Sequence, residues 1–179
     1  AGAAAATASP VKEDDDEEFT FILKASNDIK PGNYNIPYIL SYEVNQPQQK
    51  AGTFGITVSA KTELSFSAET ESSIQKQKGR VSLKVINNGL ADIRFVSVKL
   101  SPSGYSLLSA DQVYIGTINS DDFETATFDV LFSSTNAKLN AEVSYKDFDN
   151  IDRTENIEIP IKVYTREKAL ELGLIQKSF

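Results

Sequence analysis

From Phe19 onward, short runs of alternating apolar and polar residues are separated by clusters of glycine, asparagine, aspartate and proline. β-Branched and aromatic residues are frequent within the runs, and the clusters recur about every 8 to 15 residues, a spacing typical of antiparallel strands joined by turns. A helical period is absent until the C-terminal end of the chain. The pattern therefore predicts an all-β fold whose strands each bury one face.

Ten segments have this pattern and are the predicted strands. They are residues 18–25, 32–44, 50–61, 63–71, 78–87, 94–101, 113–119, 124–133, 138–145 and 156–164. The last seven span about 100 residues, which is the strand number and length of an immunoglobulin-like sandwich.

The beginning of the chain resembles its end, which indicates an internal repeat. The matching pairs are FTFILKAS at 19–26 with FDVLFSST at 128–135, NIPYILSY at 35–42 with KLNAEVSY at 138–145, and TFGITV at 53–58 with EIPIKV at 158–163. The repeat predicts the last three strands of one sandwich followed by all seven strands of another. Because three strands cannot bury both faces of a sandwich, we expect the first part to be completed by upstream sequence, the neighbouring domain or a second copy.

The chain thus divides into four predicted parts. Residues 1–18 form a disordered acidic linker or an artificial remnant of expression, with an acidic interaction tail as the alternative. Residues 19–60 are the C-terminal part of an incomplete immunoglobulin-like β-sandwich, and 61–165 form a complete antiparallel one. Residues 166–179 form a short C-terminal helical tail, with an amphipathic helix expected over 166–176.

Composition restricts the chemistry that this chain can perform. It lacks cysteine, methionine, tryptophan and histidine, which excludes a zinc site and a Ser-His-Asp triad within it, and we expect no catalytic residues and no enzyme activity. The run KEDDDEE at 12–18 contributes −5 of the net charge of −7, so the remainder carries only −2 and no basic nucleic-acid face is expected. The absence of an initiating methionine indicates a segment cut from a longer polypeptide.

Several turns and strand faces resemble a known family. Within residues 79–134, the Asn-x-Gly of 87–89, the VSVKL of 96–100, the IGTI of 115–118 and the TATFDV of 125–130 resemble the archaeal and bacterial CARDB-like, S-layer-associated cell-surface β-sandwich repeats. KPGNYNIPYILSYE, at 30–43, is similar to a stretch of the same repeats, and the resemblance covers residues 19–165.

This resemblance implies an extracellular location at the cell surface in tandem-repeat structural proteins, including proteins of cell adhesion. The tail YTREKALELGLIQKSF at 164–179 resembles the link between a last sandwich and a membrane helix, so we expect the full-length protein to be membrane-anchored outside this chain. A tail that contacts the preceding domain is the alternative.

Two places in the sequence are candidate binding sites. The first is a set of carboxylates whose spacing suits a β-loop calcium site, Asp147, Asp149 and Asp152. Calcium is the one cofactor that the sequence suggests. The alternative is a hairpin turn in which these aspartates bond to local backbone. Tyr105, which follows Ser-Pro-Ser-Gly in an expected loop, is the candidate for stacking on a sugar ring.

These observations favour a non-catalytic cell-surface spacer, adhesion or assembly module of a larger envelope protein. Its expected partners are other envelope proteins or a second copy, without nucleic acid. One alternative is an accessory carbohydrate-binding module of a surface protein or secreted enzyme, with polysaccharide as partner. Another is an appendage of an enzyme whose catalytic residues lie elsewhere.

Overall fold

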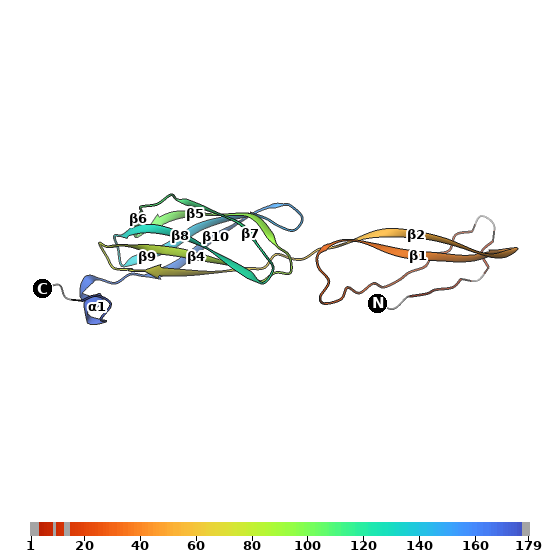
Figure 1. The fold of residues 1–179 in the computed structure, drawn as a ribbon, viewed down its shortest axis with the longest axis horizontal. Helices are drawn as coiled ribbons and strands as arrows, with labels where there is room; N and C mark the ends of the chain where they lie inside the picture. Colours follow the sequence, from red (N-terminus) through yellow and green to blue (C-terminus); the bar gives the residue numbers. More distant parts are fainter. Residues whose placement is uncertain (1–3, 9, 13–14, 177–179) are drawn as a thin grey trace.

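The computed structural model describes residues 4–8, 10–12 and 15–176, and Figure 1 shows them as an elongated chain of β-strands. Of the described residues, 58% lie in strands and 4% in helix. The predicted all-β class, with antiparallel sheets and one short C-terminal helix, is therefore confirmed. The elements are β1 (Gly32–Val44), β2 (Gln46–Val58), β3 (Leu64–Glu71), β4 (Lys78–Asn87), β5 (Ile93–Ser103), β6 (Tyr105–Leu107), β7 (Gln112–Ile118), β8 (Asp122–Phe132), β9 (Asn136–Lys146), β10 (Asp152–Lys162) and α1 (Arg166–Glu171).

Strands β3 to β10 form two antiparallel four-stranded sheets, ordered β3-β4-β8-β6 and β10-β9-β5-β7. The alternation in β4 explains how the sheets meet: Val81, Leu83 and Val85 are fully buried, whereas Ser82 and Lys84 lie on the outer face. The sheet β10-β9-β5-β7 supplies the same kind of inner face, and both contribute to one hydrophobic core. Each sheet therefore keeps water from the apolar face of the other.

The predicted strand number of the sandwich and the predicted length of the C-terminal helix were both wrong in detail. The sandwich contains eight strands rather than seven, because the three-residue strand β6 pairs with β8 after the chain crosses from β5. The C-terminal helix spans six residues and ends at Glu171, with Leu172 as its C-cap, because Gly173 adopts φ +71°, a left-handed conformation that ends helices. Residues 177–179 of the predicted tail lie outside the described part of the chain.

Strands β1 and β2 form a separate two-stranded antiparallel hairpin that extends from one end of the sandwich (Figure 1). The strand predicted over 18–25 is absent: this segment has no regular structure and runs back beside the hairpin. A strand needs a neighbour to bond its backbone groups, and none pairs with these residues.

The hairpin pairs in the same register as β9 and β10. Ile36 lies opposite Phe54 in the hairpin, and the positions that the sequence alignment matches to them, Leu139 and Ile159, lie opposite each other in the sandwich. The alternation also agrees, because every large apolar residue of β1 except Ile39 has an even number and shares one face. The hairpin is thus built like the last two strands of the sandwich.

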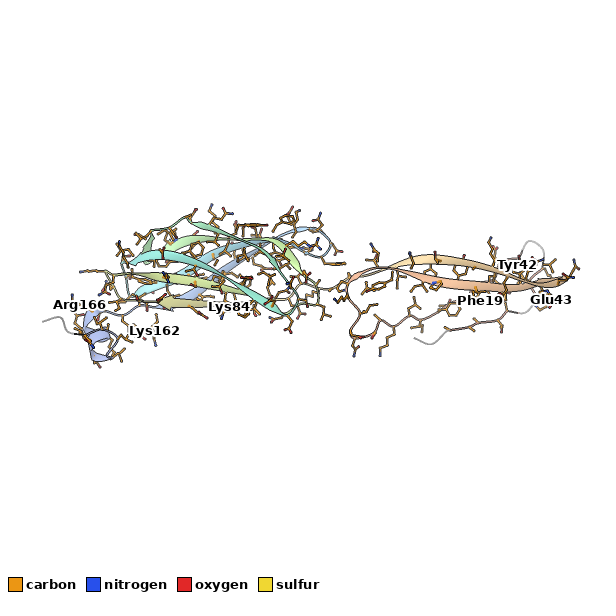
Figure 2. All side chains as sticks on the ribbon, in the orientation of Figure 1. Phe19, Tyr42, Glu43, Lys84, Lys162 and Arg166 are labelled. Carbon is orange, nitrogen blue, oxygen red and sulfur yellow. The ribbon has the colours of Figure 1, made fainter. Side chains whose placement is uncertain are left out.

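The chain enters and leaves the sandwich at opposite ends. At the entry, Leu64 pairs with Asn87, and the Asn88 backbone N–H donates to the Glu63 carbonyl at 2.8 Å. At the exit, beyond the other end of β3, Tyr164 forms a parallel bridge with Ile74. Lys162 and Arg166 lie at this far end in Figure 2. The linkage therefore suits modules joined in line.

Candidate functional site

Tyr105 lies in the core and not in an exposed loop as predicted. It belongs to β6, is 5% exposed, and its ring packs edge-on against Phe132 with centroids 6.2 Å apart. Gly104, at φ +83°, turns the chain inward, and a Cβ there would approach the backbone of Ala137 to 2.8 Å. The Ser-Pro-Ser-Gly stretch is therefore a sharp entry into a core strand, and the ring is not offered to a sugar.

The hydroxyl of Tyr105 is buried and has no hydrogen-bond partner among the described residues, and burial raises its pKa to about 12. Removing an unsatisfied buried polar atom while keeping the ring relieves its desolvation penalty. We expect Tyr105→Phe to leave the free energy of unfolding unchanged or raise it by about 1 kcal/mol, measured by urea denaturation. A loss of about 2 kcal/mol would show that the hydroxyl has a partner.

Of the predicted calcium ligands, Asp147 and Asp149 lie in the turn between β9 and β10, and Asp152 is the first residue of β10. The Asp147 side chain accepts from the Ile151 backbone N–H at 2.9 Å and pairs with Arg153, with 2.8 Å between Oδ2 and Nε. Asp152 pairs with Lys146 at 2.9 Å, whereas Asp149 is exposed. Among the described residues, no group of three or more acidic side chains is placed to hold a metal ion.

These contacts are those of a closed turn, because Asp147 uses its oxygens to fix the chain between the two strands. This geometry matches the alternative to a calcium site, a hairpin turn in which aspartates bond to local backbone. Calcium binding by the three aspartates stays a prediction that the arrangement does not favour, since Asp147 and Asp152 both face cationic side chains.

The turn is expected to make stability depend on pH at the acid end. Desolvation raises the pKa of Asp147, but hydrogen bonds from Arg153 and Ile151 outweigh it and hold the net pKa below the ordinary 3.8. Because the folded pKa is depressed, the stabilisation is complete above about pH 5 and is lost as the pH falls through the folded pKa. Asp147→Asn should flatten the decline of the melting temperature below pH 4.

The matched variant for this test is Asp149→Asn, which removes the same charge from an exposed position two residues away. It should leave the acid decline of the melting temperature unchanged. Equal flattening by both variants would mean that general charge repulsion, and not the Asp147 turn, causes the decline.

Asn87, the first residue of the motif Asn87-Asn88-Gly89, proves to be a buried polar node. Asn87 is 0% exposed, and its side-chain nitrogen donates to the carbonyls of Ala91 at 2.9 Å, Ile118 at 3.2 Å and Asn119 at 3.1 Å. Its side-chain oxygen accepts from the Gly89 N–H at 3.0 Å. One amide therefore ties the end of β4 to the end of β7. The turn was predicted from the sequence, but the role of Asn87 in joining two strand ends was not. An asparagine at an inward position of an alternating strand is the signal that could have indicated it.

A shallow groove of about 430 Å³ lies on the outer surface beside Arg80. The guanidinium is 3.2 Å from a Glu71 carboxylate oxygen and 3.3 Å from one of Asp129. All three side chains are more than half exposed, so these pairs are solvated and contribute little stability. The groove is lined by this solvated ion cluster.

Exposed large apolar side chains gather instead on the hairpin and on the segment beside it. Exposed fractions of 41–55% are found in Phe19, Phe21, Leu23, Tyr38, Leu40, Tyr42 and Phe54, and larger fractions in Ile22, Ile39 and Val44. Soluble monomers seldom leave such runs in water, and surfaces of this kind mark sites of association. The hairpin is therefore the strongest candidate for a functional surface.

Comparison with known proteins gives no family. No protein-family model matches the chain, and no curated protein matches it. A solved structure described as Northeast Structural Genomics Consortium target SoR45 aligns over 68% of this chain and 93% of that chain, with 14% identity and a TM-score of 0.35. A likeness this weak adds nothing to the fold described above. No described helix is long and apolar enough to span a membrane.

Proposed function

We propose that the chain is a non-catalytic spacer, adhesion or assembly module of a cell-envelope protein, built from immunoglobulin-like sandwiches joined in line. The observation that carries the proposal is the passage of the chain through the sandwich, which it enters beside Leu64 and leaves beside Tyr164 at the other end (Figure 1). A module connected at opposite ends holds its neighbours apart.

The strand order supports an immunoglobulin-like assignment. The sheet β3-β4-β8-β6 corresponds to strands A-B-E-D of that fold, and β10-β9-β5-β7 corresponds to G-F-C-C′. One departure is that β6, the D-like strand, precedes β7 in the chain. The hairpin, with the register of β9 and β10, is then the F-G pair of a second such unit.

The cell-surface location rests on the resemblance of the turn and strand motifs to S-layer-associated repeats, and other envelope proteins are the proposed partners. Polysaccharide binding is the weaker candidate, because the tyrosine chosen for it is buried in the core. The mechanism proposed here is mechanical: paired strands and a packed core keep a fixed distance between the two ends.

The distance between the ends tests the spacer function. The chain has no cysteine, so Glu63→Cys and Arg166→Cys, both at exposed positions, allow a donor and an acceptor dye to be attached at entry and exit. Strands of up to 11 residues set this separation at roughly 40 Å, and we expect one narrow distribution of energy transfer that polysaccharides and calcium leave unchanged. A broad distribution, or one that a polysaccharide shifts, would contradict the spacer function.

A further inference from the structure

One face of the β1–β2 hairpin is apolar, and we call it the hairpin apolar face. Its apolar residues are Tyr34, Ile36, Tyr38, Leu40, Tyr42, Val44, Phe54, Ile56 and Val58, which share one side of the paired strands. The turn end of β2 adds Gln46, Gln48 and Lys50 to this side, with Lys50 opposite Leu40. The Tyr38 ring lies over Gly52, where an added Cβ would meet it at 2.4 Å. The opposite face is mostly polar and has cross-strand hydrogen bonds, such as that from the Thr57 hydroxyl to Asn33 at 2.8 Å.

The equivalent face in the sandwich is fully covered. By the shared register, Leu40 corresponds to Val143 and Tyr42 to Tyr145, which are 0% and 5% exposed because the facing sheet packs on them. In the hairpin, the same two positions are 46% and 41% exposed. An isolated two-stranded hairpin is at best marginally stable in water, so this face needs a second sheet against it.

The edges of the hairpin are unsuited to adding a strand. Pro37 and Pro47 lack a backbone N–H, and proline fits an antiparallel ladder only where its nitrogen faces away from the paired strand. Pro37 therefore interrupts the outer edge of β1, and Pro47 that of β2. Prolines at sheet edges oppose edge-to-edge pairing, which favours a partner that covers the face over one that extends the sheet.

The surface available is sufficient for a partner of the same kind. The hairpin apolar face and the adjacent 19–23 segment together leave seven large side chains about half exposed. At about 200 Å² for each fully exposed side chain of this size, that amounts to on the order of 600 Å² per copy. Two copies would bury about 1,200 Å², the lower bound of a stable interface.

We propose that the hairpin apolar face binds the same face of a second copy of this chain, so that two hairpins close into a four-stranded sandwich about a two-fold axis. This inference rests on the proposed function and names the partner of the assembly module. The face meets the requirement of such an interface, since one patch made of large apolar side chains is complementary to itself. The sandwich of each copy then extends away from the joined hairpins.

The test is the solution mass of the full chain, measured by light scattering over a range of concentrations, for the wild type and two variants. Leu40→Lys places a charge within the hairpin apolar face, and Ile39→Lys places the same charge on the neighbouring residue of the opposite face, where the side chain is 67% exposed. We expect a dimer for the wild type and Ile39→Lys. Leu40→Lys should weaken the dimer at least about 100-fold, because each dimer contains the substitution twice.

A wild-type chain that remains monomeric at every concentration would overturn the inference, and so would a dimer that both lysine variants weaken equally. The circular dichroism of the sandwich should be the same in all three proteins, which separates loss of association from loss of folding.

Single cysteines supply a second readout in this cysteine-free chain. The thiol of Leu40→Cys should react with iodoacetamide more slowly as the protein concentration rises, whereas that of Ile39→Cys should react at a constant rate. Concentration-independent rates at both positions would overturn the inference. The end-to-end distance between residues 63 and 166 does not depend on these results, so the spacer function and the dimer can fail separately.

Discussion

Replacing Asn87 by alanine should lower the free energy of unfolding by about 3 kcal/mol. The substitution removes the donor that satisfies the carbonyls of Ala91, Ile118 and Asn119 and the acceptor for the Gly89 N–H. These groups surround a side chain that is 0% exposed, so water does not readily replace the lost amide. Urea denaturation of the full chain, followed by circular dichroism, measures the loss.

The neighbouring residue offers a matched control. Asn88 is exposed, and its side chain makes one hydrogen bond, of 2.8 Å, to the Ser65 hydroxyl. Asn88→Ala should therefore lower the free energy of unfolding by less than about 1 kcal/mol. Equal losses in the two variants would mean that the turn depends on asparagine's backbone preference and not on the buried amide of Asn87.

Phe128→Ala should lower the free energy of unfolding by about 4 kcal/mol, because it removes a fully buried ring and leaves a cavity between the sheets. Phe128 lies opposite Val81 on β4 and belongs to the core that both sheets share. The loss is therefore a direct measure of how tightly the sandwich is packed. The midpoint of thermal or urea unfolding measures it.

Phe123→Ala is the control on the same strand. Its ring is 51% exposed and lies 4.9 Å from the Lys84 ammonium on the outer surface. Removing it should lower the free energy of unfolding by about 1 kcal/mol or less. If Phe128→Ala cost no more than Phe123→Ala, the two sheets would not share a close-packed core.

Most strands of the sandwich were predictable because one face of each is buried. The alternation of β4 and β8 gives their positions to within about two residues, since a shift by one residue would turn the buried face to water. The strand β6 was missed because three residues are too few to show a period. The segment 18–25 has the right alternation, but a strand also requires a partner, which alternation cannot reveal.

The candidate site was harder to predict, because its residues depend on three-dimensional context. Tyr105 follows turn-forming residues, which suggested a loop, but the left-handed Gly104 directs it into the core. Asp147 has a carboxylate that could bind a cation, but the guanidinium of Arg153, six residues away, donates a hydrogen bond to it. The open apolar face of the hairpin, in contrast, was foreseeable, because the repeat predicted only three strands in the first part, too few to bury both faces of a sandwich.

We propose a structural module that bears load from end to end, and single-molecule stretching measures this resistance. With handles attached through cysteines at positions 63 and 166, force along β3 and β10 shears many strand-pairing bonds at once. We expect one cooperative rupture that lengthens the chain by about 300 Å, the extended length of the enclosed residues minus the folded span. Strands that peel away in successive small steps at low force would contradict it.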